Sequence, residues 1–252
     1  MLDSTASGRP SFLTTQWGLI TASAQGSAEA RAALEGLYRA YCHPVYTFIR
    51  RRGYSRPDAQ DLTQDFFIHL LEKGMLGRAD PERGRFRSFL LGALDHFLAH
   101  AAERAAACKR GGGRQIVLLD DETAETQYQL AAPEGLSAES LFDARWALTL
   151  LGYALERLAR QYAMGHKEAV FETLKGFVAL GTSGPESPYE KAAQTLGVGV
   201  GTVKTLIYRL RKQYLALVRE EVTRTVSDPA EVEGELRALC DALVAAEGHL
   251  GP

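Results

Sequence analysis

The stretch 187–217 constrains the fold of this chain more than any other, because its residues fit two short helices joined by a tight turn. Ser187 can cap the first helix, with Pro188 at its first helical position and Glu190 three residues further on, which is the spacing of a capping box. The glycine-rich segment 197–199 allows a sharp turn. The pattern therefore predicts a helix-turn-helix.

The second helix of this pair has one apolar side and one cationic side. An α-helix turns by about 100° per residue, which places the apolar residues from Val200 onward on one side of the helix. The opposite side is cationic and hydrogen-bonding. No Asp or Glu occurs between Glu190 and Glu220. Such a face suits a helix in the DNA major groove between two phosphate strands. The alternative is a solvated surface helix, although these normally mix charge signs. The apolar positions are Val203, Ile207, Leu210, Tyr214 and Leu217.

Charge alternates along the 252 residues, although the formal net charge is only −2. The net charge is +4 over 1–112, −5 over 113–140, +4 over 141–225 and −5 over 226–252. Two mildly basic modules thus alternate with two acidic segments, which is typical of a nucleic-acid binder with an acidic linker and tail. The near-neutral total argues against tight, sequence-independent coating of DNA.

Almost no stretch shows the alternating pattern of a β-strand, so the predicted class is all-α. We expect two small helical domains joined by a long acidic linker, the second ending in the helix-turn-helix, and an acidic helical extension at the C-terminus. Three cysteines stand far apart without metal-site spacing, which is typical of reduced cytosolic thiols. There is no signal-peptide pattern and no apolar run of membrane-spanning length, so we expect a cytoplasmic protein without a membrane segment.

A helix expected from Ser55 to Glu72 has a narrow acidic stripe opposite a buried side. Acids at this spacing repel by about 0.2–0.5 kcal/mol per pair, so the stripe does not stabilise the helix. A basic or amide-rich partner would explain it. The alternative is a set of solvating acids, some of them favourably placed near the helix N-terminus. The stripe consists of Asp58, Asp61, Asp65 and Glu72, bordered by Gln64 and Ile68.

Further along, Arg83, Arg85 and Arg87 are interleaved with glycine and phenylalanine before a very apolar helical run. Cations beside aromatic rings can follow a single-stranded backbone and stack its bases. The later aromatic and aliphatic residues of the run are interpreted as core. Phe86 and Phe89, next to the arginines, fit a core position and a DNA surface equally well.

Three segments in this order, DAQDLTQDFF, RFRSFLLGAL and GVGVGTVKTLIYRLR, resemble the two regions typical of bacterial sigma factors of the compact extracytoplasmic-function (ECF) type. The resemblance covers residues 30–112 and 139–222, approximately. It implies a region 2-like domain over 15–112, a linker over 113–138 and a region 4-like helix-turn-helix domain over 139–223. The remaining extension, 224–252, is a candidate regulatory element, and we hypothesise that it folds back on one of the basic modules.

Such a factor binds core RNA polymerase and directs promoter recognition, DNA melting and transcription initiation, with no catalysis and no cofactor of its own. The resemblance implies contacts with the clamp helices of the polymerase β′ subunit and with the β flap, and an anti-sigma factor is a further candidate partner. The residues implied in core binding are Asp58, Asp61, Gln64, Asp65 and Ile68.

The same resemblance implies two sets of promoter contacts. For recognising and melting the minus-ten element, with capture of a flipped base, they are Arg85, Phe86, Arg87, Phe89, His96, His100, Arg104, Lys109 and Arg110. For the minus-thirty-five element they are Val200, Thr202, Lys204, Thr205, Tyr208, Arg209, Arg211 and Lys212. Many relatives have Asn in place of His96, so the identity of the captured base is left open. Relatives often have Arg in place of Leu206, so one common DNA contact is expected to be missing.

Two other classes of function fit parts of the pattern. A stand-alone helix-turn-helix regulator with an N-terminal sensor or interaction domain would bind duplex DNA by itself, typically as a dimer. An enzyme could use Asp61, Asp65, His69 and Glu72 as an acid/base or metal cluster, but the second Glu-x-x-His of such bundle sites is missing.

Overall fold

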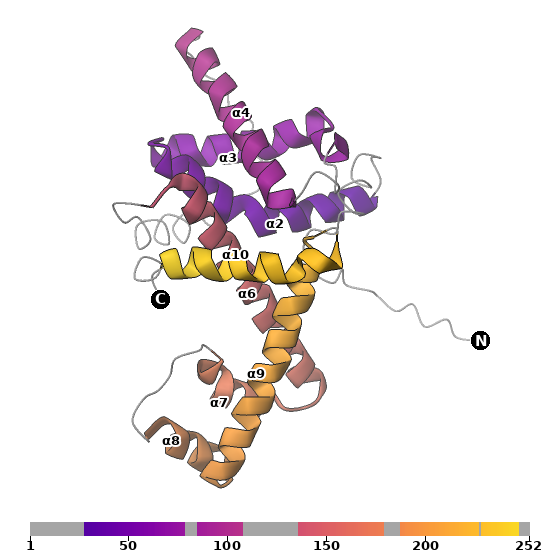
Figure 1. The fold of residues 1–252 in the computed structure, drawn as a ribbon, viewed down its shortest axis with the longest axis vertical. Helices are drawn as coiled ribbons and strands as arrows, with labels where there is room; N and C mark the ends of the chain where they lie inside the picture. The colour runs from indigo at the N-terminus through magenta and orange to yellow at the C-terminus, as the bar shows by residue number, and fades with distance from the viewer. Residues whose placement is uncertain (1–27, 79–84, 108–135, 179–186, 227, 247–252) are drawn as a thin grey trace, which may run out of the picture. The chain divides into compact units, whose positions relative to one another are not determined.

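The computed structural model describes residues 28–78, 85–107, 136–178, 187–226 and 228–246. Within these ranges every regular element is helical (Figure 1), which confirms the predicted all-α class. The sequence pattern also predicts a short helix over residues 16–24; this helix and nearly all of the acidic linker lie outside the described residues.

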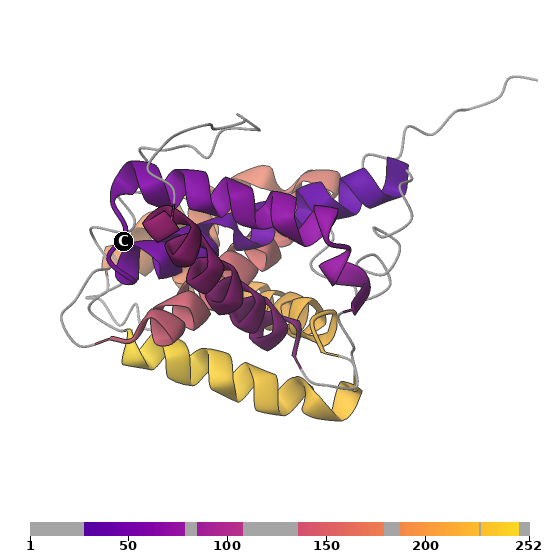
Figure 2. The same ribbon diagram turned by 90° about the horizontal axis from the view of Figure 1, so that it is seen from above.

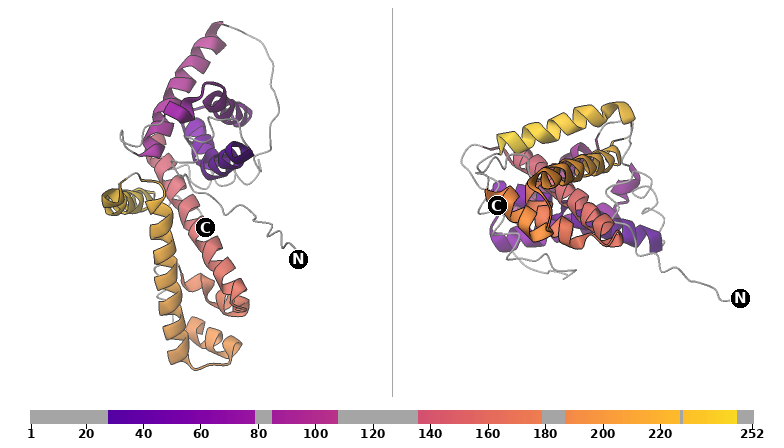
Figure 3. Two further views of the ribbon diagram at one scale, coloured as in Figure 1. Left: turned by 90° about the vertical axis from the view of Figure 1, so that its right-hand side faces the viewer. Right: turned by 90° about the horizontal axis from the view of Figure 1, so that it is seen from below.

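The chain divides into two compact units. Unit 1 comprises residues 1–149 and 222–252, and unit 2 comprises residues 150–221. Both boundaries fall inside continuous helices, α6 (Ala138–Met164) and α9 (Val200–Thr223), which Figure 3 shows without interruption. This division differs from the predicted domain limits because a long helix can belong to two cores. It does not test the functional domains, which stay a prediction.

In unit 1, helix α2 spans Ala28–Arg51 and continues through Pro44. A proline inside a helix removes a hydrogen bond and costs about 3 kcal/mol, and from the sequence alone Pro44 is expected to kink or split this helix. The split does not occur. The residues around Pro44 are packed inside, with Tyr41 1% exposed and Val45 fully buried. Tertiary packing therefore outweighs the local cost.

Helix α3 spans Arg56–Glu72 and begins where the sequence predicts. Ser55 is its N-cap, and the Ser55 Oγ accepts a hydrogen bond from the backbone N–H of Asp58 at 3.3 Å. Just before it, Gly53 has a φ of 94°, in the left-handed region that favours glycine. Helix α2 thus ends just before this glycine, and α3 begins at Ser55, where the sequence predicts it.

Aromatic contacts hold α3 between α2 and α4 (Phe86–Ala107). The ring of Phe67 meets Tyr38 of α2 edge-on at 4.9 Å between centroids, and Phe66 lies 5.6 Å from Phe97 of α4. A short 3-10 helix, η1 (Met75–Arg78), follows α3. Because these rings occupy one side of α3, the acidic side faces away from the core.

Tyr41 joins three helices at the centre of unit 1. Its ring stacks on Trp146 of α6 at 4.3 Å between centroids and meets the edge of Phe86 of α4 at 5.6 Å. All three side chains are at most 1% exposed. Offset and edge-on pairs of this kind contribute about 0.5–1.5 kcal/mol each beyond the burial of their area. The N-terminal part of α6 therefore belongs to the core of unit 1.

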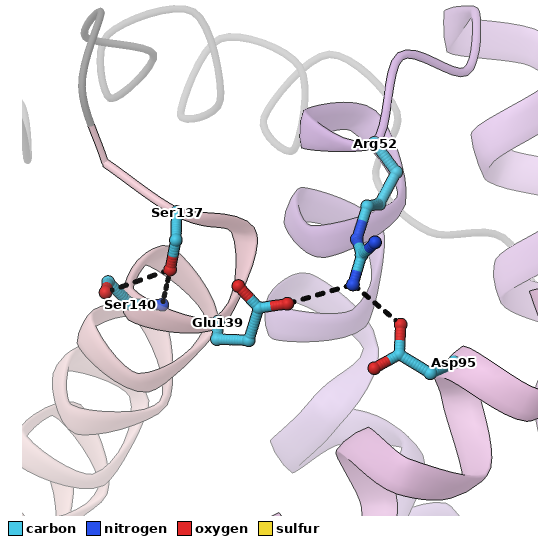
Figure 4. A network of polar contacts seen from close by, with 5 residues as sticks. All are labelled: Arg52, Asp95, Ser137, Glu139 and Ser140. Atoms are coloured by element: carbon cyan, nitrogen blue, oxygen red, sulfur yellow. Dashed lines mark hydrogen bonds and ion pairs between the residues drawn. The ribbon is translucent and has the colours of Figure 1, made fainter.

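A surface network fixes the start of α6 next to α2 and α4 (Figure 4). Arg52 Nη2 lies 2.8 Å from the carboxylate of Asp95 and 2.9 Å from that of Glu139. Ser137 Oγ accepts a hydrogen bond from the backbone N–H of Ser140 at 3.1 Å and caps α6; the sequence left Ser137 and Ser140 both open as the start of this helix. Exposed ion pairs contribute little to stability, so this network orients α6 more than it stabilises it.

Unit 2 contains α7 (Glu168–Leu174), the 3-10 helix η3 (Lys175–Phe177), α8 (Ser187–Leu196) and most of α9. The turn between α8 and α9 follows the predicted glycine pattern. Gly197 has a φ of 64°, and the next residue, Val198, donates its backbone N–H to Ala193 O at 3.1 Å. The buried side of α9 is the predicted apolar one, with Val203 and Leu210 fully buried and Ile207 4% exposed.

The chain returns to unit 1 at its C-terminal end. Asp228 caps the 3-10 helix η4 (Pro229–Glu231), accepting a hydrogen bond from the backbone N–H of Ala230 at 2.8 Å. Helix α10 (Val232–Ala245) follows and lies along one side of unit 1 (Figure 2). The helical extension expected from the sequence is therefore present.

Replacing Trp146 by alanine should lower the free energy of unfolding by about 3–5 kcal/mol, because a fully buried ring and its stacking partner are lost. Val244→Ala is the control, because Val244 is 68% exposed and its truncation should stay within about 0.5 kcal/mol. Urea unfolding followed by far-ultraviolet circular dichroism measures both. Equal stability of the two variants would contradict the central place of Trp146.

Candidate functional site

Helix α3 presents its acidic stripe to solvent. Asp61 and Asp65 are exposed, while Gln64 and Ile68 beside them are half-buried. The opposite side of the helix packs inward through the fully buried Phe66. The residues predicted to bind core polymerase therefore lie on one accessible side of α3. We call this set the acidic face: Asp58, Asp61, Gln64, Asp65 and Ile68.

Asp58 differs from the rest of the acidic face because it takes part in the helix cap. The Ser55 hydroxyl donates to Asp58 Oδ2 at 2.6 Å and accepts from the Asp58 backbone N–H. A carboxylate in the first turn also interacts favourably with the positive end of the helix. Asp61 lies beyond that turn and has no part in the cap. Its position on the surface therefore points to a partner more than to helix stability.

The start of α4 lies inside unit 1. Phe86 is 1% exposed with its ring against Tyr41, and Arg87 is 7% exposed. Side chains this buried cannot touch DNA unless the surrounding helices move. The prediction that Phe86 and Arg87 face DNA does not fit this arrangement, and for Phe86 the core alternative holds. Phe89 is half-buried, with its ring 5.8 Å from that of Phe86.

Arg85 and Arg87 form ion pairs with acids that the sequence did not indicate. Arg85 Nε lies 2.8 Å from Glu235 Oε2, and Arg87 Nε lies 2.8 Å from Glu235 Oε1. Arg87 also pairs with Asp143 of α6. Burial lowers the pKa of the Arg87 guanidinium, but Asp143 and Glu235 outweigh burial and raise that pKa above its ordinary value. Arg87 therefore stays charged in the interior.

The exposed part of α4 carries His96 and His100. Their Nε2 atoms lie 3.2 Å apart, and the His100 Nδ1 lies 3.2 Å from the carboxylate of Glu103. A hydrogen bond between these two nitrogens requires one of them as donor and the other as acceptor. Of the other predicted minus-ten residues, the Arg104 side chain, Lys109 and Arg110 lie outside the described residues.

Helix α9 shows the two-sided pattern that the sequence predicts. Tyr208 is 68% exposed, and Lys204 Nζ lies 5.8 Å from the ring centroid of Tyr189 on α8. This contact is within the range of a weak cation–π interaction. We call the exposed set the basic face of α9: Thr202, Lys204, Thr205, Tyr208, Arg209 and Lys212.

Two predicted DNA contacts at the edges of this face are half-buried, Val200 and Arg211. Arg211 Nε donates to the backbone carbonyl of Phe177 at 2.8 Å, which ties α9 to the end of η3. One turn on, the Tyr214 hydroxyl donates to Leu151 O at 3.2 Å, and burial raises the pKa of Tyr214 to about 12. Arg211 therefore has a structural role on this helix.

The comparison with protein families concerns the part of unit 1 that holds α3 and most of α4. Residues 37–105 match the family Sigma-70 region 2. This match supports a sigma-70 family sigma factor, and with it a role in RNA polymerase binding and promoter recognition. No curated protein and no solved structure matches the chain.

The region 2 match contains the acidic face, but the acids that pair with its arginines lie outside it. Asp143 is on α6 and Glu235 is on α10. Neither acid is predicted as a partner from the sequence, although α10 carries a signal for one of them. Val232, Glu235 and Leu239 share the buried side of that helix, and a charge on a buried side needs a buried counter-charge.

Two negative findings apply to the described residues only. No group of three or more His, Cys, Asp or Glu side chains there is arranged to hold a metal ion. Among the described helices, none combines the length and the apolar character of a membrane-spanning segment.

Arg211→Ala should lower the free energy of unfolding by about 1–2 kcal/mol, because it removes a charged donor from the Phe177 carbonyl. Arg209→Ala on the same helix is the matched control, and the exposed position should change stability by less than about 0.5 kcal/mol. Urea unfolding of both variants makes the comparison. If the two lose the same stability, Arg211 does not have the structural role assigned to it.

Proposed function

We propose that this chain is an ECF-type sigma factor that binds core RNA polymerase and directs promoter recognition, DNA melting and transcription initiation. The observation that supports this most strongly is the region 2 match over residues 37–105, with the exposed acidic face of α3 inside it. We infer that the factor acts by binding and does no chemistry itself.

The acidic face is proposed as the surface for the β′ clamp helices of core polymerase. Exposed carboxylates at Asp61 and Asp65 offer charge for a basic partner, and Gln64 and Ile68 between them add a hydrogen-bonding and an apolar contact. Surfaces of mixed charge and apolar character are typical of protein–protein contacts. A contact with the β flap belongs to the same proposal for the region 4-like domain.

Helices α8 and α9 are proposed as a helix-turn-helix that recognises the minus-thirty-five element. The turn at Gly197 and the buried Val203 and Leu210 hold α9 so that its basic face is accessible. Lys204, Arg209 and Lys212 would supply phosphate or guanine contacts in the major groove. The minus-ten element is proposed to bind at α4, where His96 and His100 are exposed.

Asp61→Arg should abolish stoichiometric binding to bacterial core RNA polymerase, because it reverses a charge at the centre of the acidic face. The fold should be kept, since the side chain is exposed. Co-purification with core polymerase, next to circular dichroism of each variant, measures this. Glu156→Arg, an exposed acid on α6 outside region 2, is the control with the same charge change. Equal core binding by both variants would refute the assignment of the acidic face.

Arg209→Ala should weaken binding of duplex promoter DNA and reduce the salt slope by about one for each lost phosphate contact. If Arg209 instead reads a guanine, the loss should be about 1–3 kcal/mol and confined to sequences with that base. Fluorescence anisotropy at several salt concentrations distinguishes a phosphate contact from a guanine contact. The DNA is a promoter that the polymerase-bound chain selects from a random library. Lys167→Ala, an exposed cation at the start of α7, should change neither quantity; an effect equal to that of Arg209→Ala would argue against recognition by α9.

A further inference from the structure

Helix α10 has an acid where an amphipathic helix ordinarily has an apolar residue. Val232 is 3% exposed and Leu239 is 5% exposed, and Glu235 between them is 1% exposed. Burying an isolated carboxylate is very unfavourable, so a buried Glu requires partners with opposite charge. The position of Glu235 therefore specifies what α10 can lie against.

The partners of Glu235 are the two arginines at the start of α4. Arg87 Nη2 donates a hydrogen bond to Glu235 Oε2 at 3.3 Å, and Arg87 Nε lies 2.8 Å from Glu235 Oε1 as an ion pair. Arg85 Nε lies 2.8 Å from the same carboxylate. The backbone of Gly234 also lies close to Arg85, since a Cβ at that glycine would be 3.8 Å from Arg85 Nη2. One carboxylate thus binds two guanidinium groups for which the family resemblance implies contact with DNA.

The two arginines depend on α10 to different degrees. Arg87 has a second acid, Asp143 on α6, which would still neutralise it if α10 moved away. The ion pair found for Arg85 is with Glu235, and its side chain is already 34% exposed. Departure of α10 would therefore make Arg85 the more accessible of the two cations.

We propose that α10 is an intramolecular mask of the minus-ten DNA surface, with Glu235 holding Arg85 and Arg87 in place of DNA phosphate. Carboxylate and phosphate are both two-oxygen partners for a guanidinium fork. The same donors cannot serve Glu235 and DNA together, so docking of α10 and binding of the melted strand exclude each other. This inference rests on the proposed function, because it assumes that the start of α4 binds promoter DNA.

The test compares four full-length chains: wild type, Glu235→Gln, Asp241→Asn and the double variant Arg85→Ala with Glu235→Gln. The probe is a fluorescein-labelled single-stranded oligodeoxynucleotide of random sequence, bound in the presence of core polymerase. Glu235→Gln should bind it at least about fivefold more tightly than wild type, the lower end of ordinary coupling between two sites. Its affinity should also fall more steeply with salt, because an additional cation reaches phosphate.

The other variants show whether the gain comes from unmasking. Asp241 is an exposed acid on the same helix, so Asp241→Asn removes one negative charge from α10 without changing the ion pairs of Glu235, and it should match wild type. Removing Arg85 should cancel the gain of Glu235→Gln, since the two residues act through one contact. Equal affinities of wild type and Glu235→Gln would overturn the proposal, as would an equal gain in Asp241→Asn.

A second measurement covers the possibility that Glu235→Gln disturbs the fold. Hydrogen exchange of the α10 amides in wild type should accelerate when the oligonucleotide binds, and unchanged exchange with bound oligonucleotide would overturn the proposal. Core binding is scored separately, so absence of core binding would refute the proposed function, and the oligonucleotide comparison on the free chain would still decide the masking.

Discussion

The buried carboxylate of Glu235 is the constraint on which the arrangement of unit 1 depends. An anion in a protein interior must be matched by cations, and here the start of α4 supplies them through Arg85 and Arg87. Arg87 in turn needs Asp143, which brings the start of α6 to the same place. Buried ion pairs of this kind add little net stability but allow few alternative placements. Apolar contacts hold α10 on unit 1, and the charges decide where it lies.

Much of the fold could be predicted because its signals are local. The cap at Ser55, the turn at Gly197 and the apolar side of α9 each depend on residues within a few positions of one another. The continuity of α2 through Pro44 could not be predicted in this way, because it depends on packing around Tyr41 by residues from α4 and α6. For the same reason no local pattern indicates that α6 contributes to two cores.

The residues of the candidate surfaces also differ in whether a local sequence pattern predicts their exposure. Exposure of Asp61 on α3 and of Arg209 on α9 follows from amphipathic pattern alone, since each lies opposite an apolar side. The burial of Arg87 does not follow from the local pattern, because its partner Glu235 is 148 residues away along the chain. An arginine next to phenylalanine fits a nucleic-acid surface and an interior ion pair equally well until the distant acid is known. The useful local signal was on the other partner, an acid on the buried side of α10.

The two proposed surfaces of region 2 respond differently to α10. With α10 docked, Asp61 and Asp65 on the acidic face remain exposed, whereas the arginines at the start of α4 are engaged. A mask placed in this way leaves the proposed polymerase contact open and blocks only the proposed contact with melted DNA. Control by α10 would then act after the factor has joined core polymerase, at the step where the separated strand competes with one carboxylate for the same guanidinium groups. This order of events follows from the position of Glu235, which pairs with the arginines at the start of α4 and leaves the acidic face of α3 exposed.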